Sequence, residues 1–483
     1  MSKAAAVSRI LSKDACEVIA RRIFAFTQGG GETRADILSW WDGELRWARN
    51  RASLSSDRRD VQVTIRRFIQ GSAGSAITNQ LDDASLEAAV RAAEREVALF
   101  GSVAHAPKVQ APIPELARPK TAIWSDPTFD LATDDRGEIV HALIEPVEAK
   151  GMLSFGYLEV RGGAQMVVSS LRADGPFAPW DMPYASWTQA QCSMTVRDPA
   201  GDASGWAGLS SYDWQRIDPR ALGARALEKC LASRNPVAIE PGRYTVILEP
   251  QAVADLLDGG RGLLLDGFER ELPEKFPPPE GGPWALGYDQ ALRLHRSKLG
   301  LKVVDSRVTI SHDPADPELG IIPLPGMQPV TWIDHGVLTN LVYGRKYALE
   351  DLNANTMLRF PIGYRMSGGP TSVEEMIHTT KRGLLITRFF DIMPLDLNSL
   401  LCTGLTRDGL WLIENGKISK AVKNFRFTES PLFVLNSIDQ LGEPVPVFRP
   451  VKSPYVGEVA LTPAIVPPLK ARDFSFTSLI DAI

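Results

Sequence analysis

One stretch near the middle of the chain, residues 242–257, constrains the fold most, because it joins a strand directly to a helix. Tyr244 to Leu248 is short and rich in branched residues, as a β-strand is. Pro250 can open a helix, since the first helical residue does not need a backbone N–H. Gln251 to Leu257 then gives about two helical turns before a pair of glycines. The residues before this unit and the residues after it predict different kinds of domain.

The residues before it predict an N-terminal α+β domain over residues 1–236, with a curved antiparallel sheet and helices. Val61 to Ile69 alternates apolar and polar residues with a period of two, which indicates a strand. Strands, a glycine-rich turn and an Asp-capped helix occur once around residues 61–97 and again around residues 156–231. This repeat suggests two strand–strand–helix units within one α+β domain.

The residues after it predict a β-rich C-terminal domain over residues 237–483. Asn415-Gly416 lies between two strand-like segments and suits a type I′ hairpin, which needs two positive φ angles. Asp334-His335-Gly336 predicts a second hairpin. Ser430-Pro431 opens a last helix, which we expect to continue to Gly442.

Composition excludes several classes of protein. The chain has 483 residues, a net charge of -5 and four widely spaced cysteines. No run approaches the ~18 apolar residues that cross a membrane, and charges interrupt the N-terminus where a signal peptide would be apolar. We therefore expect a cytoplasmic protein without a membrane anchor. The arginines between Arg46 and Arg67 alternate with apolar positions and lack interleaved aromatic residues, which argues against nucleic-acid binding.

Several segments of the chain resemble the TldD/PmbA (TldD/TldE) family, whose members are metallopeptidase-like and are also called modulators of DNA gyrase. The segments that carry the resemblance are residues 242–257 (GRYTVILEPQAVADLL), 297–300, 366–369, 383–388 and 404–423. The resemblance implies two domains and dimers that enclose an inner cavity. It also implies pairs in which TldD holds zinc, while TldE lacks the ligands but is needed to cleave unfolded or precursor peptides.

The zinc signature of the TldD branch is missing from this sequence. The family's His-Glu-x-x-x-His motif falls on Asp258, Gly259 and Leu263, and no cysteine follows Cys402 to supply the distal thiolate. A catalytic zinc needs three protein ligands. We therefore expect no catalytic residue and no metal ligand in this chain, with zinc in a TldD-type partner.

Other residues offer weaker candidates for chemistry. His312, Asp313 or His335 could serve in a rebuilt hydrolase site, although Asp-Pro and Asp-His-Gly are also good turn formers. Cys402 has no histidine near it in the sequence, so we expect an inert thiol.

A glycine-bounded segment, residues 403–409, predicts a polar loop. Its residues Thr406, Arg407 and Asp408, together with His335, are our candidates for contact with a peptide or a partner. A salt-bridged turn is the alternative interpretation of the loop.

Three functions remain open from the sequence. The first is a non-catalytic TldE/PmbA-like subunit that binds peptides, either in a heterodimer with a TldD-type zinc-bearing subunit or as a homodimer. The second is a stand-alone metallopeptidase with a rebuilt site. The third is a regulatory binding protein of the gyrase-modulator kind.

Overall fold

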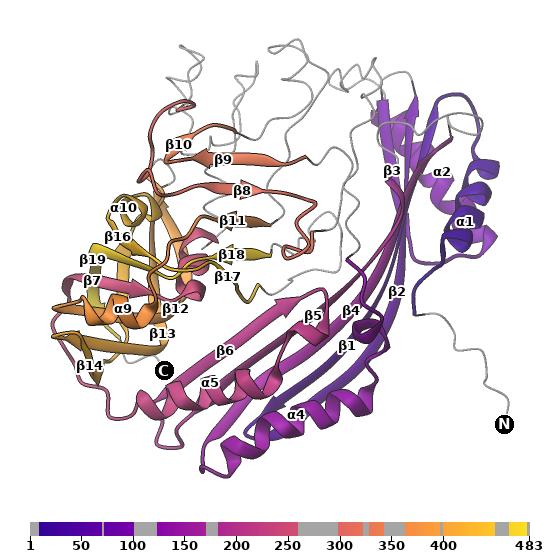
Figure 1. The fold of residues 1–483 in the computed structure, drawn as a ribbon. Coiled ribbons are helices and arrows are strands. Elements are labelled where there is room, and N and C mark those ends of the chain that lie inside the picture. Colours follow the sequence, from indigo (N-terminus) through magenta and orange to yellow (C-terminus); the bar gives the residue numbers. More distant parts are fainter. Residues whose placement is uncertain are drawn as a thin grey trace.

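A computed structural model describes residues 9–69, 72–100, 123–170, 182–258, 298–321, 328–341, 363–396, 399–449 and 463–480. The chain combines helices with many strands in an α+β fold, as the sequence predicts. A long curved sheet forms its N-terminal part, and a strand-rich C-terminal part sits on the concave side of that sheet (Figure 1). In the described part, no helix is long and apolar enough to cross a membrane.

The N-terminal sheet has six antiparallel strands in the order β3-β2-β1-β4-β5-β6. The strands are β1 (Glu32–Ala48), β2 (Arg51–Ile69), β3 (Ser72–Thr78), β4 (Leu153–Ser169), β5 (Met182–Arg197) and β6 (Ser204–Ser211). The helices on its convex side are α1 (Lys13–Phe26), α2 (Asp83–Phe100), α3 (Asp126–Asp130), α4 (Thr133–Glu148) and α5 (Pro219–Ala232) (Figure 1). A 3-10 turn, η2 (Trp214–Arg216), precedes α5.

The internal repeat seen in the sequence corresponds to two structural halves. Each half runs through three antiparallel strands into a helix, β1-β2-β3-α2 and β4-β5-β6-α5, and the halves meet where β1 pairs with β4. A Cβ on Gly74 would lie 2.3 Å from the backbone of α2, and one on Gly205 would lie 2.3 Å from the backbone of α5. Both glycines therefore let the third strand of a half pack closely against its helix.

The two faces of this sheet differ in chemistry. Even-numbered residues of β4, such as Leu158 and Val160, pack against the helices together with Trp41 and Leu45 of β1. Successive side chains of a strand point to opposite faces. The odd-numbered residues of β4 therefore lie on the concave face, and many of them are polar.

The C-terminal part contains two further sheets. The first runs β10-β9-β8-β11-β18-β17, and the second runs β12-β7-β19-β15-β13-β14 and closes on itself because β12 also pairs with β13. The strands of the first sheet are β8 (Ile310–His312), β9 (Val330–Asp334), β10 (Val337–Leu338), β11 (Tyr364–Met366), β17 (Val445–Pro446) and β18 (Ala464–Val466). Those of the second are β7 (Gly242–Leu248), β12 (Arg382–Asp396), β13 (Leu401–Glu414), β14 (Lys417–Ala421), β15 (Phe425–Glu429) and β19 (Leu469–Leu479), with β16 (Ile438–Leu441) beside β19.

The closed sheet is a barrel filled by apolar side chains. Its aromatic centre consists of Phe389, Phe425, Phe427, Phe474 and Phe476, with ring centroids of neighbouring pairs 4.6 to 5.5 Å apart. Two short helices, α9 (Val373–His378) and α10 (Pro431–Asn436), pack on it. Aromatic pairs at this spacing add to the stability that their burial gives.

Two local expectations can be compared directly with these elements. Asn415 and Gly416 have φ angles of 52° and 78° and connect β13 to β14, so the predicted hairpin is confirmed. The last helix begins after Ser430 as predicted, and the Ser430 hydroxyl accepts the Leu432 N–H. Its predicted end at Gly442 is wrong, because residues 438–441 pair with β19 as a strand instead.

Candidate functional site

The predicted strand-to-helix unit forms one wall of the candidate site. Residues 242–248 are β7, and residues 250–258 are helical. Val253 and Leu257 of this helix are 1% exposed in the C-terminal core. Residues 251, 255 and 258 follow at spacings of four and three and therefore share the opposite stripe of the helix, which is polar.

The first two residues of this stripe tie the helix to its neighbours. Gln251 Nε2 donates to Asp255 Oδ1 at 2.8 Å and to the Phe448 carbonyl at 3.2 Å, and Gln251 Oε1 accepts the Phe448 N–H at 3.0 Å. Asp255 Oδ2 accepts the N–H of Phe389 on β12 at 3.0 Å. Burial raises the pKa of Asp255 to about 6.

Asp258, at the end of the described helix, binds two other side chains. The Tyr364 hydroxyl donates to Asp258 Oδ2 at 2.6 Å, and the Arg449 guanidinium forms an ion pair with the same oxygen. Only 11% of the Asp258 side chain is exposed. Burial raises the pKa of Asp258, and the positive charge of Arg449 acts against that rise.

These residues do not fit a zinc ion. Asp258 stands where the resemblance places the first ligand, but its carboxylate already holds a cationic side chain, which would repel a metal cation. Gly259 and Leu263 have no ligating atoms in their side chains and lie outside the described residues. Among the residues that the structure describes, no three His, Cys, Asp or Glu side chains gather closely enough to hold a metal.

The predicted polar loop at residues 403–409 is part of a strand, so the loop expectation is wrong. These residues belong to β13 and pair with β12. Thr406 is 1% exposed, and its hydroxyl accepts the Phe425 N–H at 2.9 Å. The Arg407 guanidinium lies 4.1 Å from the Phe390 ring centroid. Both residues lie in a strand that pairs with β12, so this segment forms no loop.

A β-bulge explains where Asp408 goes. Asp408 and Gly409 lie opposite the single residue Thr387, and Asp408 has a φ of 57°. A bulge of this kind redirects a side chain. Asp408 is thereby fully buried, where it accepts from Arg388 Nε at 2.7 Å.

This ion pair belongs to the contact between the two parts of the chain. The Arg388 guanidinium also stacks on the ring of Trp206 from β6, 4.6 Å from its centroid. Nearby, Lys229 of α5 donates to Glu249 at 2.6 Å, and Arg225 donates to the same carboxylate at 3.1 Å. These contacts join β6 and α5 of the N-terminal part to β12, β13 and the residue after β7 in the C-terminal part.

The histidine candidates are not brought together. His312 is 4% exposed, and its Nδ1 lies 2.9 Å from the Gly363 carbonyl; burial lowers its pKa. His335 lies exposed in the β9–β10 turn, with a φ of 46° and a 2.7 Å contact from Nδ1 to Asp334. His312 pairs with Val330 at the far end of β9, so His335 is roughly 17 Å away along the strand. His335 also lies in a different sheet from Asp408.

Cys402 is buried in the barrel. Its thiol donates to the Glu429 carbonyl at 3.2 Å, and burial raises the pKa of Cys402 to about 12. A thiol with such a pKa stays protonated near neutral pH and is a poor nucleophile.

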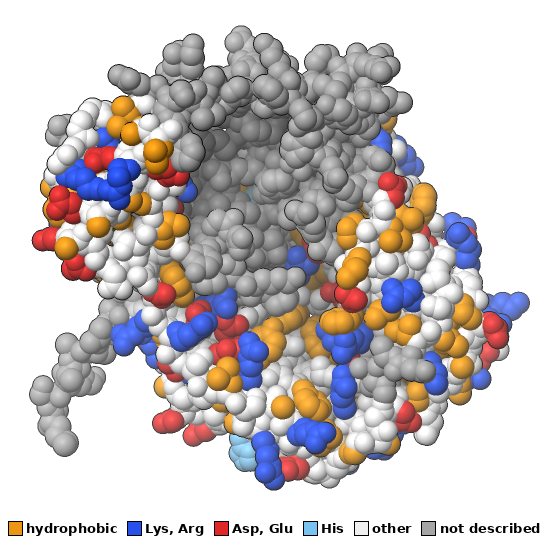
Figure 2. Space-filling model, turned by 180° about the vertical axis from the view of Figure 1, so that it is seen from behind, with side chains coloured by type: hydrophobic (Ala, Val, Ile, Leu, Met, Phe, Trp, Pro, Cys, Tyr) orange, Lys and Arg blue, Asp and Glu red, His pale blue; other side chains and the backbone are white. Residues whose placement is uncertain are grey.

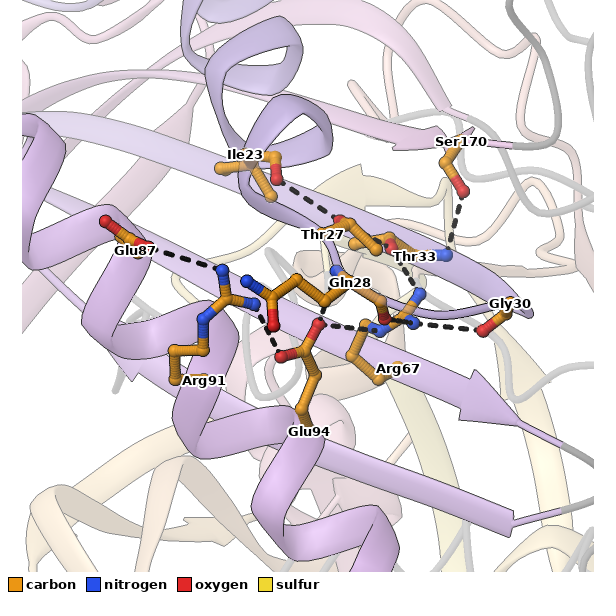
Figure 3. A network of polar contacts seen from close by, with 10 residues as sticks. All are labelled: Ile23, Thr27, Gln28, Gly30, Thr33, Arg67, Glu87, Arg91, Glu94 and Ser170. Atoms are coloured by element: carbon orange, nitrogen blue, oxygen red, sulfur yellow. Dashed lines mark hydrogen bonds and ion pairs between the residues drawn. The ribbon is translucent and has the colours of Figure 1, made fainter.

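One arginine of the N-terminal sheet, Arg67, is buried and forms hydrogen bonds within the fold. Arg67 is fully buried and donates to the Thr33 hydroxyl at 2.6 Å and to the carbonyls of Gln28 and Gly30 at 3.0 and 3.1 Å, with Glu94 near its Nε (Figure 3). It holds the glycine-rich turn between α1 and β1. On the face seen in Figure 2, basic and acidic side chains are interspersed over the described surface.

Sequence reasoning did not find Tyr364 and Arg449. The polar stripe at 251, 255 and 258 could have been read from its helical spacing. Its partners could not, since Tyr364 lies 106 positions from Asp258 and a lone arginine before the tail carries no signal of its own.

Comparisons with known proteins relate the C-terminal part of the chain to a known family. Residues 241–462 match the family model described as the PmbA/TldA metallopeptidase C-terminal domain. Comparison with curated protein sequences gave no match. The C-terminal part of the chain, residues 241–462, therefore belongs to the TldD/PmbA family.

Solved structures support the same fold over nearly the whole chain. One is a candidate DNA gyrase modulator from Thermotoga maritima, with 16% identity and a TM-score of 0.73 over 95% of this chain and 100% of that one. TldE from Thermococcus kodakarensis and a candidate DNA gyrase modulator from Bacteroides thetaiotaomicron each have 16% identity and a TM-score of 0.72, over 96% of this chain and 99% of theirs.

Proposed function

We propose that this chain is a non-catalytic, TldE/PmbA-like subunit of a TldD/TldE-type zinc metallopeptidase. In this role it helps to bind unfolded or precursor peptides, while a TldD-type partner supplies zinc and cleaves them. The observation that carries the proposal is Asp258. Its carboxylate is held by Arg449 and Tyr364, so it serves as a structural ion pair where a catalytic relative would place a ligand.

The proposal includes a two-domain division at residues 236 and 237 and a cytoplasmic location. It also includes a dimer, with a zinc-bearing relative or with a second copy of this chain. The similarity to TldE from Thermococcus kodakarensis is consistent with this role, since it extends over 96% of this chain.

An exposed strand segment supports binding of an extended chain. Beyond Ile386, the outer edge of β12 pairs with no other strand that the structure describes. Phe390, Met393 and Leu395 of this segment are 45%, 55% and 56% exposed. Apolar side chains beside open main-chain groups are what a peptide or partner strand contacts when it adds to a sheet.

The test is reconstitution with a family member that carries an intact His-Glu-x-x-x-His motif. The purified chain alone should contain no stoichiometric zinc by elemental analysis and should not cleave a fluorescence-quenched unfolded peptide. Cleavage should appear when both chains are mixed, and it should vanish when the partner's motif histidines are replaced by alanine. Cleavage by the metal-stripped chain alone would refute the proposal.

Two alternatives make different predictions. A stand-alone hydrolase would use a rebuilt site with His312, Asp313 or His335, and the separation of the two histidines along β9 gives a site that combines them little support. A regulatory role is favoured by the description of two structural neighbours as candidate gyrase modulators. Such a role would be supported if this chain captured a topoisomerase without any peptidase partner.

A further inference from the structure

The outward face of the barrel at β12 and β13 carries an arginine, Arg407, that has no role in the site described above. Side chains along a strand point alternately into the barrel and out of it. Phe389 lies in the aromatic core and pairs with Thr406, which is 1% exposed. The neighbours of these two residues, Arg388, Phe390 and Arg407, therefore point outward.

The Arg407 guanidinium is held in position without being paired. It lies 4.1 Å from the ring centroid of Phe390, which is a cation–π contact. Asp408 Oδ2 is 3.8 Å from Arg407 Nε, which is too far for a hydrogen bond. In the part of the chain that the structure describes, no acceptor receives a hydrogen bond from Arg407. A guanidinium has five N–H donors, so an oxyanion is the partner that suits it best.

Asp408 does not serve as this partner, because another arginine holds it. Arg388 Nε donates to Asp408 Oδ2 at 2.7 Å, and Asp408 is fully buried. Burial lowers the pKa of Arg407; Asp408 opposes this effect, whereas the positive charges of Arg388 and Arg197 add to it. These neighbouring cations favour the binding of an additional anion beside Arg407.

The same outward face becomes apolar beyond the arginines. Phe390 pairs with Leu405 and Met393 pairs with Thr403, so two further rows follow that of Arg407. Along β13 these rows are two residues apart, or roughly 7 Å. Phe390 and Met393 are 45% and 55% exposed. Alternate side chains of an extended peptide are separated by the same distance, so one such segment can reach the arginine and both apolar rows.

We propose that this face binds an extended peptide segment in which an acidic side chain is followed by apolar side chains at alternate positions. Arg407 donates to the carboxylate of the acidic side chain, while Phe390 and Met393 contact the apolar ones. The inference rests on the proposed function for a peptide as the ligand. It adds a preference for particular side chains, which recognition of the main chain alone does not give.

The first test compares two peptides on the wild-type chain alone. One has a glutamate and two leucines at alternate positions with serines between them, and the other has glutamine in place of the glutamate. Both have blocked ends and a neutral fluorophore. Fluorescence anisotropy should report at least about fivefold tighter binding of the glutamate peptide, since glutamine has a similar shape but no charge. Affinities within about twofold of each other, or no binding of the glutamate peptide, would overturn the proposal.

The second test removes the cation. Arg407→Met should weaken binding of the glutamate peptide at least about fivefold and leave binding of the glutamine peptide within about twofold, which shows that the surface is still folded. The matched control is Arg472→Met, which changes an arginine of the same barrel that is 61% exposed and pairs with Asp439. This control should keep the full preference for glutamate. An Arg407→Met variant that also keeps it would overturn the proposal.

The third test addresses the apolar rows. Met393→Ser removes an exposed apolar contact but no charge, so it should weaken binding of both peptides by a similar factor of about three or more. Unchanged binding, or a loss confined to the glutamate peptide, would contradict the assignment of Met393 to the peptide surface.

These outcomes can be separated from the outcome for the proposed function. Peptide binding is measured without a partner, whereas the subunit role is measured as cleavage with one. A chain that prefers the glutamate peptide through Arg407 but never supports cleavage would refute the subunit role alone. A chain that supports cleavage but binds both peptides equally well would refute the acidic preference alone.

Discussion

Replacing Arg449 by leucine tests whether the Asp258 ion pair is a structural element. In the wild type, Arg449 neutralises a carboxylate that is only 11% exposed. Removing one partner of such a pair leaves a charge with little solvent, which typically costs about 3–5 kcal/mol. The Tyr364 hydroxyl remains as a hydrogen-bond donor at 2.6 Å, so we expect the lower part of this range.

The measurement is urea unfolding followed by tryptophan fluorescence, in the transition that includes the C-terminal barrel. Arg449→Leu should lower the free energy of unfolding by about 3 kcal/mol. Adding Asp258→Asn should restore at least about 2 kcal/mol, because the double variant no longer buries an unpaired charge. The control is Arg472→Leu, which breaks a pair whose arginine is 61% exposed and should cost less than about 1 kcal/mol.

Two results would refute this reasoning. One is an Arg449→Leu variant as stable as the Arg472→Leu control. The other is a double variant in which the two costs add in full, since residues that form one pair must couple.

The remaining predictions concern stability elsewhere. Burial raises the folded-state pKa of Asp255 to about 6, so the free energy of unfolding of the wild type should fall by up to about 3 kcal/mol as pH rises from about 4 to about 6. Asp255→Asn should lack this loss. The prediction would be contradicted if the difference in unfolding free energy between Asp255→Asn and the wild type were the same at pH 4.5 and at pH 7.5. Gly205→Ala should destabilise the fold by more than about 2 kcal/mol, because its Cβ would clash with the α5 backbone. Gly137→Ala lies in open space on α4 and should stabilise the fold by about 0.5–1 kcal/mol. Thermal melts of the two variants measure both effects. Arg67→Met should cost about 2–3 kcal/mol in the same melts, because it removes hydrogen bonds to three acceptors, one of which is the buried Thr33 hydroxyl. A loss below about 1 kcal/mol would show that water replaces these bonds.

Local chemistry made parts of the fold predictable from the sequence. The strand, proline and helix at residues 242–258 and the hairpin at Asn415-Gly416 depend on neighbouring residues, and both form as expected. Most of β1 was not predicted. Trp40 and Trp41 lie on opposite faces of this strand and both are buried, so the alternation that indicates a half-buried strand is lost.

The candidate site was less accessible to sequence reasoning. The missing zinc motif could be read directly, but the ion pair that takes its place depends on a contact between Asp258 and Arg449, which are far apart in the sequence. Asp408 was expected on a loop, since Arg and Asp between glycines usually mark one. A bulge opposite Thr387 instead turns this carboxylate inward, and only the register of two paired strands reveals the bulge.

The two matching halves of the N-terminal sheet have a consequence for how the protein could be divided. Each half has three strands and a closing helix, and the halves meet along β1 and β4. A chain cut between α2 and α3 would leave fragments with β1 and β4 as open central edges, and Trp41 and Leu45 of the first fragment would need the second fragment to cover them. Co-expressed fragments would then reassemble along that edge, which would make this junction a natural place for a split reporter.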